Sequence, residues 1–237
     1  MVKRISFLAI LIAALLLGGC GRMENTESKK QNINDLALAY MEQKYGEPFE
    51  YAAPYGDSMS GTHEILASCA SLPSQKILVQ VENYKRDDKI FCDNYLAVKY
   101  REETIAYFLR FATDVFGDAN VFYEVAKMPL SPELSANATF DEYLADTHGF
   151  ISACIEIRGS SFVEKEQVQE MINSIVTSCK ADNLTLIIVF VKDELFGTTD
   201  EDALRRNVVR RQFVHCARVT RENGEVQIEW LGGITNE

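Results

Sequence analysis

The chain begins with an apolar block that is followed abruptly by a polar one. Residues 5–17 are almost entirely apolar, two basic residues precede them, and residues 20–31 are polar without a repeating apolar position. A membrane-spanning helix needs roughly 20 apolar residues, so this run is short for one. A short positive region, an apolar core and small residues after it are typical of a secretory signal peptide. We therefore predict a cleaved leader at 1–19, a flexible tether at 20–31 and a folded domain at 32–237.

Apolar residues then recur every three or four positions in several segments, which is typical of amphipathic helices. Asn34 is a candidate cap for the first of them, and Gly46 and Pro48 end it. Thr139 and Glu142 have the spacing of a capping box at the start of a short helix. The helices predicted on this basis cover residues 32–46, 93–117, 139–147 and 164–180.

Between these helices lie runs that are rich in β-branched and aromatic residues. Residues 184–191 are continuously apolar, as expected for a buried central strand, and a segment at 49–53 is predicted to end at Pro54. Asn223-Gly224 between two alternating runs predicts a carboxyl-terminal β-hairpin. The remaining predicted strands cover residues 63–71, 77–81, 90–92, 120–127 and 150–157. We expect an α+β fold with a mixed or mainly antiparallel sheet and packed helices.

A loop rich in proline and small polar residues interrupts this pattern. Residues 127–139 contain two of the five prolines of the chain, so they are the best candidate for a boundary between two subregions.

Composition limits the partners of the domain. The chain has 24 basic and 35 acidic residues, and the leader removes two of the basic ones, which leaves a net charge of −13. A strongly acidic chain is repelled by nucleic acid and by anionic lipid headgroups. With 47% hydrophobic residues the domain can bury a real core. We expect no nucleic-acid partner and no electrostatic attachment to a membrane.

Five cysteines follow Cys20, and each lies among apolar neighbours. No two of them have the Cys-x-x-Cys spacing of a zinc site or a thioredoxin-like motif, and their odd number leaves at least one outside any intramolecular disulfide. Buried free thiols are favoured over any particular pair, and the disulfide state stays open. These cysteines are Cys69, Cys92, Cys154, Cys179 and Cys216.

Candidate catalytic groups do not form a complete set. Gly56-Asp57-Ser58 resembles the start of the Gly-Asp-Ser motif of a lipase-like hydrolase family, but the partner Asp-x-x-His of that family is absent. His63, His148 and His215 lack the spacing of metal ligands. We therefore expect no catalytic residue, no metal and no cofactor.

The segment 198–212 is the strongest candidate for a charged binding site. Three acidic residues precede four arginines, an order that the helix dipole favours and that local helix electrostatics is enough to explain. The sharper hypothesis is an anion or partner-binding site, because arginine binds carboxylates and phosphates in bidentate fashion. Its residues are Arg205, Arg206, Arg210 and Arg211. The tyrosines at 40, 45, 51 and 55 are a second candidate, as an exposed interface or as packing of an amphipathic helix.

Leu17-Gly18-Gly19-Cys20 resembles the lipobox of bacterial lipoproteins at all four positions. The resemblance implies that Cys20 receives a diacylglyceryl group, that a lipoprotein signal peptidase cleaves before it, and that the domain is held at the cell membrane on its outer side. Residues 44–51 also resemble, loosely, a stretch of uncharacterised lipoproteins of Gram-positive bacteria, which implies no activity.

These observations give two function classes. The first is a membrane-anchored extracytoplasmic lipoprotein whose domain binds an envelope protein or a small ligand. The second is a tethered extracytoplasmic enzyme, of which a hydrolase is the most plausible kind. Because no nucleophile, base and orienting group occur together in the sequence, we favour binding.

Overall fold

The computed structural model describes residues 32–57, 61–125, 134–146, 150–198, 200–209 and 213–232. The predicted leader, Cys20 and the predicted tether lie outside these ranges. Among the described residues, no helix has the length and apolar character needed to cross a membrane.

The first part of the domain is one helix packed on a four-stranded sheet. The strands follow one another as an antiparallel meander in the order β1-β2-β3-β4. Ala37 and Met41 of the helix are fully buried against one face of the sheet, together with Ile65 and Val79. The elements are α2 (Ile33–Tyr45), β1 (Phe49–Asp57), β2 (His63–Cys69), β3 (Ile77–Glu82) and β4 (Ile90–Asp93).

Strand β1 continues through Pro54 to Asp57, so the predicted end of this strand at Pro54 is wrong. Proline lacks a backbone N–H, and a strand tolerates it where no neighbour needs that donor. β1 is at the edge of its sheet, and its register with β2 shifts between Pro54 and Gly56. Both features accommodate the proline.

The helix predicted at 93–117 consists of two helices, α3 (Tyr95–Lys99) and α4 (Arg101–Phe116). Tyr100 separates them, with φ −94° and ψ 17°. Its hydroxyl donates a hydrogen bond to the carbonyl oxygen of Ala138 at 2.6 Å, so a contact distant in sequence accompanies the break.

The second sheet has five strands in the order β5-β6-β7-β8-β9. β6 and β7 are parallel and are joined through helix α6, while all other neighbours are antiparallel. The predicted α+β class with a mainly antiparallel sheet is therefore confirmed, and so is the hairpin β8–β9. The elements are β5 (Ala119–Glu124), α5 (Phe140–Leu144), β6 (Phe150–Arg158), α6 (Lys165–Ser178), β7 (Asn183–Val191), α7 (Glu201–Val209), β8 (His215–Glu222) and β9 (Glu225–Gly232), with short 3-10 turns η1 (Gly159–Ser161) and η2 (Asp193–Leu195).

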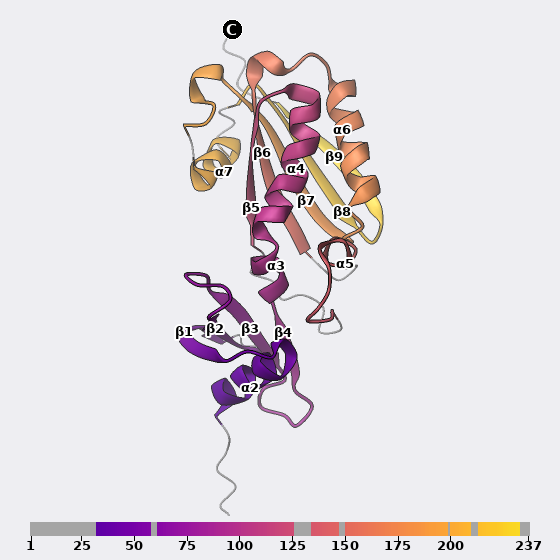
Figure 1. Ribbon diagram of the computed structural model, residues 1–237. Helices are drawn as coiled ribbons and strands as arrows, with labels where there is room; N and C mark the ends of the chain where they lie inside the picture. The colour runs from indigo at the N-terminus through magenta and orange to yellow at the C-terminus, as the bar shows by residue number, and fades with distance from the viewer. Residues whose placement is uncertain are drawn as a thin grey trace, which may run out of the picture. The chain divides into compact units, whose positions relative to one another are not determined.

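Helices α4 and α6 lie against the second sheet (Figure 1). Alternating side chains of β6 and β7 form a core on each face of this sheet. Ile155 and Ile188 pack in the larger core, to which α4 and α6 contribute Phe108 and Ile172. Cys154 and Val189 pack on the other face, where α7 contributes Leu204 and Val208. A strand buried on both faces needs apolar residues at successive positions, which is the pattern of residues 184–191.

Two local signals are confirmed in detail. Asn223 and Gly224 have positive φ values of 51° and 81°, as the tight turn between β8 and β9 requires. The side chains of Thr139 and Glu142 satisfy each other's backbone N–H groups in a capping box at the start of α5.

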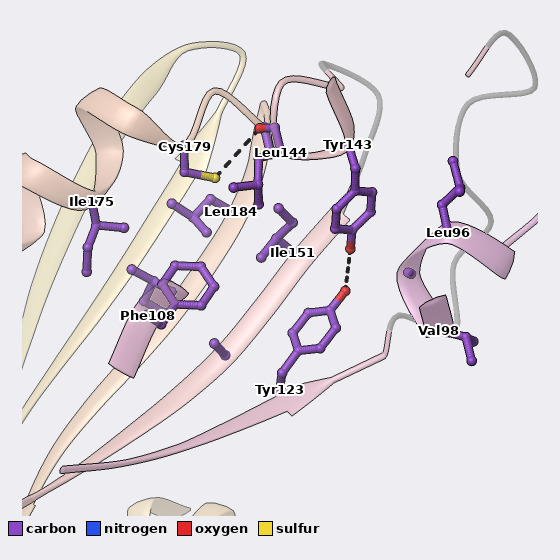
Figure 2. Packing of buried hydrophobic residues seen from close by; sticks show 14 of the residues in the cluster. Leu96, Val98, Phe108, Tyr123, Tyr143, Leu144, Ile151, Ile175, Cys179 and Leu184 are labelled. Atoms are coloured by element: carbon purple, nitrogen blue, oxygen red, sulfur yellow. Dashed lines mark hydrogen bonds between the residues drawn. The ribbon is translucent and has the colours of Figure 1, made fainter. Parts of the chain in front are cut away.

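Beside α5, two phenols meet inside the larger core. The hydroxyls of Tyr123 and Tyr143 are hydrogen-bonded, and the thiol of Cys179 lies 3.9 Å from the carbonyl oxygen of Leu144 (Figure 2). Burial raises the pKa of Tyr123 to about 12 and raises that of Tyr143 well above its usual value. Both phenols are therefore neutral in the folded chain.

The candidate boundary at 127–139 lies between β5 and β6, which pair in the same sheet. Residues 127–133 lie outside the described ranges.

Candidate functional site

The most elaborate polar cluster is built where the end of α2 meets the end of β4. Tyr40 and Lys44 are four residues apart and therefore lie on one face of α2, with Tyr45 next to them. Asp93 is the last residue of β4 and is 1% exposed. The short loop at 46–48 returns the chain from α2 into β1, and the meander then brings β4 beside the helix.

Asp93 accepts four hydrogen bonds. Lys44 Nζ donates at 2.9 Å, the hydroxyls of Tyr40 and Tyr45 donate at 3.1 and 2.7 Å, and the backbone N–H of Tyr95 donates at 2.9 Å. A buried carboxylate is tolerated only when it is paired and fully hydrogen-bonded, and this one is both. Burial, followed by the charge and hydrogen bond of Asp93, raises the pKa of Tyr40 and of Tyr45.

Lys44 has donor capacity beyond this cluster. Its ammonium donates to Asp93 and, at 3.0 Å, to the hydroxyl of Tyr40. An ammonium carries three protons, and the contacts with described residues use two of them. The Lys44 side chain is 14% exposed and lines the groove described next.

A groove of ≈ 570 Å³ opens beside Lys44. Its volume is in the range of small-molecule sites, and its wall combines polar groups with the apolar side chain of Leu134. Gln43 and Asn137 carry exposed amides that can both donate and accept. The lining includes Tyr40, Gln43, Lys44, Leu134, Ser135 and Asn137. This arrangement suits a ligand with several oxygen acceptors better than a chemical reaction.

A second cluster brings a nucleophile-type side chain against a carboxylate. Ser71 donates to Glu47 through its hydroxyl at 2.5 Å and through its backbone N–H at 3.2 Å. Tyr95 donates to the same carboxylate at 3.0 Å, and Cys69 Sγ lies 3.3 Å from Ser71 Oγ. Burial alone would raise the pKa of Glu47, but the hydrogen bonds from Ser71 and Tyr95 outweigh it and lower that pKa. A carboxylate with a lowered pKa is a weak general base. The hydrogen bonds of this cluster therefore join the segment after β2 to the loop before β1.

The four arginines of the sequence hypothesis are only partly described. Arg205 is half-buried and Arg206 is exposed, both on α7, whereas Arg210 and Arg211 lie outside the described residues. Asp200 accepts a hydrogen bond from the backbone N–H of Ala203 at 2.6 Å, as a helix cap does. The acidic start of this segment therefore has a local explanation, and the anion-site hypothesis stays a prediction.

The described histidines have packing or hydrogen-bonding roles. His63 Nε2 is 2.7 Å from Asn34 Oδ1, and the ring of His215 stacks on Phe162 with centroids 3.8 Å apart. Burial lowers the pKa of His215, which favours its neutral form. Ser58 of the Gly-Asp-Ser stretch and His148 lie outside the described ranges.

Four of the five cysteines of the domain are buried as predicted, and no disulfide joins two cysteines within the described ranges. Cys69 differs, because it is half-buried beside Ser71 at the end of β2. Burial raises the pKa of Cys92 to about 11 and that of Cys216 to about 12, so both are unreactive thiols near neutral pH.

Within the described ranges, no three side chains of His, Cys, Asp or Glu are placed to hold a metal ion. The predicted tyrosine cluster divides: Tyr40 and Tyr45 belong to the Asp93 cluster, while Tyr51 and Tyr55 are each 44% exposed on β1.

Sequence reasoning missed Asp93 and the groove. Asp93 follows Cys92 at the end of a short strand, and nothing local distinguishes it from a turn residue. The spacing of Tyr40 and Lys44 on one helix face was the available signal, because a lysine beside tyrosines on a mostly buried face needs a nearby carboxylate.

Comparison with known proteins identifies no family. No family model matches the chain, and no curated protein matches it. A solved structure of a DUF5037 family protein from Ruminococcus gnavus aligns with a TM-score of 0.39 and 12% identity, over 82% of this chain and 94% of that chain. A TM-score this low shows neither a shared fold nor a shared function.

Proposed function

We propose that this chain is a membrane-anchored extracytoplasmic lipoprotein whose α+β domain binds a ligand or an envelope partner. One observation carries the anchoring: Leu17-Gly18-Gly19-Cys20 follows a short basic and apolar leader. Diacylation of Cys20 provides two chains at about 0.8 kcal/mol per buried methylene, and two lipid signals are what stable anchoring takes. The acidic charge of the domain provides no attraction to anionic lipids, so the acyl chains alone hold it.

The groove beside Lys44 supports a binding role. It offers an ammonium proton, two amides and an apolar wall, which are the groups that fix the orientation of a small polar ligand. The Ser71 cluster supports the same choice, because its carboxylate has a lowered pKa and its hydroxyl is already committed.

Replacing Cys20 by Ser is expected to abolish acylation, since serine lacks the thiol that the lipid is transferred to. Cells expressing the full chain are grown with a palmitate analogue, and the protein is isolated. The mass of its amino-terminal peptide is then measured by mass spectrometry. The wild type should carry the label and begin at Cys20, whereas the variant should carry none and keep its leader. Partition into membranes is not the readout, because an uncleaved leader also holds a protein there.

Cys69→Ser is the matched control, because Cys69 is the half-buried thiol of the domain. This variant should keep the full label. Label on Cys20→Ser equal to that on the wild type, or a wild-type chain that begins at Met1, contradicts the anchor.

The binding role is tested with a photo-reactive amino acid at Gln43, which is exposed in the groove. The full chain is expressed in intact cells and irradiated, and the adduct is weighed. We expect an adduct at Gln43, with a small mass increase for a small ligand or a large one for a protein. Glu50 is an exposed control outside the groove lining and should give none. No adduct at Gln43, or equal adducts at both positions, rules out the groove as the binding site.

A further inference from the structure

Strand β9 leaves an edge of the five-stranded sheet open. It pairs with β8 on one side, and no described strand pairs with its other side. Its eight residues keep one regular register with β8, from Glu222↔Glu225 to His215↔Gly232, without a bulge. The strand contains neither proline nor lysine, the residues that commonly protect such an edge.

The other edges of the two sheets are irregular or shorter. β1 contains Pro54 and two shifts of register, which disturb pairing with a further strand. β4 has only four residues and β5 has six, against the eight of β9. The contrast makes β9 the edge best suited to accept another strand.

The side chains of β9 separate into two faces. Val226, Ile228 and Trp230 lie opposite Arg221, Val219 and Ala217 of β8, on the face that α6 covers. Lys165 at the start of α6 places its ammonium 5.0 Å from the centroid of the Trp230 ring. Gln227 and Glu229 lie on the opposite face, where both are exposed. An incoming strand must therefore present apolar residues to one face and polar ones to the other.

We propose that β9 pairs antiparallel with β9 of a second copy of this chain, about a two-fold axis at Ile228. In this register Ile228 faces itself and Val226 faces Trp230, an aromatic and β-branched pair that stabilises sheets. On the other face Gln227 lies opposite Glu229. The two five-stranded sheets then form one continuous sheet.

The positions of the glutamates favour this register over the neighbouring ones. Centring the axis on Gln227 places Glu225 opposite Glu229, and centring it on Glu229 places that residue opposite itself, so both registers contain like charges. Centring it on Val226 or Trp230 avoids this but shortens the overlap of the two strands. The register at Ile228 combines the longest overlap with no facing glutamates. This self-complementarity is the reason for choosing a second copy as the occupant.

Cysteine cross-linking tests the register directly. Directly opposite residues of antiparallel strands have Cα atoms roughly 4.5–5.5 Å apart, which a disulfide can span. In the full chain with Cys69→Ser, Ile228→Cys should give a disulfide-linked homodimer in intact cells under mild oxidation. Val226→Cys alone should not, because its two copies would lie more than about 13 Å apart along the strands.

A second pair of cysteine variants is needed because a change at half-buried Ile228 can itself disturb the fold. Gln227→Cys and Glu229→Cys change exposed residues and should cross-link when the two variants are co-expressed. Neither variant should cross-link alone, because the Cα atoms of its two copies would be about 8 Å apart. Absence of the product from both designs overturns the proposal. Equal cross-linking at all positions does so as well, as does a product that contains a different protein.

Gln227 also allows a test without cross-links. Gln227→Glu creates two like-charge pairs per dimer, and Gln227→Lys creates two opposite-charge pairs. The dimer dissociation constant of the detergent-solubilised full chain should rise by about 2- to 30-fold in the first variant and fall by a similar factor in the second. Equal dissociation constants for the two variants, or a monomeric wild type, contradict the pairing.

Discussion

Replacing Asp93 by Ala is expected to lower the free energy of unfolding by about 3–5 kcal/mol, the cost typical of breaking a buried ion pair from one side. The change leaves Lys44 charged at a site where only 14% of its side chain is exposed. It also removes the acceptor of the Tyr40 and Tyr45 hydroxyls and of the Tyr95 backbone N–H. Each of these donors would have to find water or remain unpaired.

Urea unfolding of the full chain, followed by tryptophan fluorescence and circular dichroism, measures this effect. Asp114→Ala is the matched control, because Asp114 is an exposed carboxylate on α4 and its removal should leave stability unchanged. Lys44→Met should cost less than Asp93→Ala, since the carboxylate keeps three donors. A loss below about 1 kcal/mol in Asp93→Ala would show that the cluster is not a structural centre.

The sequence signals that predicted the structure correctly are those between residues close to one another in the chain. The turn at Asn223-Gly224 and the capping box at Thr139 depend on residues within four positions of each other, and both are present as expected. The strand at 184–191 is also local in origin, because burial on both faces leaves a continuous apolar run.

The features that sequence reasoning missed are set by contacts between distant segments. The break at Tyr100 accompanies a hydrogen bond to Ala138, and no glycine or proline marks it. The end of β1 depends on its position at a sheet edge, which decides whether Pro54 is tolerated. Asp93 gains its role from Lys44 and Tyr40, which are 49 and 53 residues earlier in the chain. The periodicity of apolar residues predicts which face of a helix or strand is buried. It does not predict which polar group from a distant segment packs against that face.

The stability of the domain is expected to fall steeply above about pH 10, the pKa of tyrosine in an unfolded chain. Burial raises the pKa of Tyr40, Tyr45, Tyr123 and Tyr143 in the folded chain, for Tyr123 to about 12. Between the two pKa values the unfolded chain releases a proton that the folded chain keeps. The contribution of each phenol is therefore complete below the unfolded pKa and is lost as the pH rises towards the folded one, by about 1.4 kcal/mol per pH unit.

Four such phenols together predict a loss of several kcal/mol per pH unit, enough to unfold a domain of ordinary stability before pH 12. The thiols of Cys92 and Cys216, whose pKa values burial also raises, add losses of the same sign from about pH 8.5. Urea unfolding at half-unit steps from pH 8 to 11.5 measures the slope, and phenolate absorbance should rise together with unfolding. Tyr143→Phe removes one buried phenol and should make the slope shallower, whereas Tyr51→Phe removes an exposed one and should not. If stability stayed constant up to pH 11.5, these phenols would be accessible to water in the folded chain, and the burial of the core at Tyr123 and of the cluster at Asp93 would both be wrong.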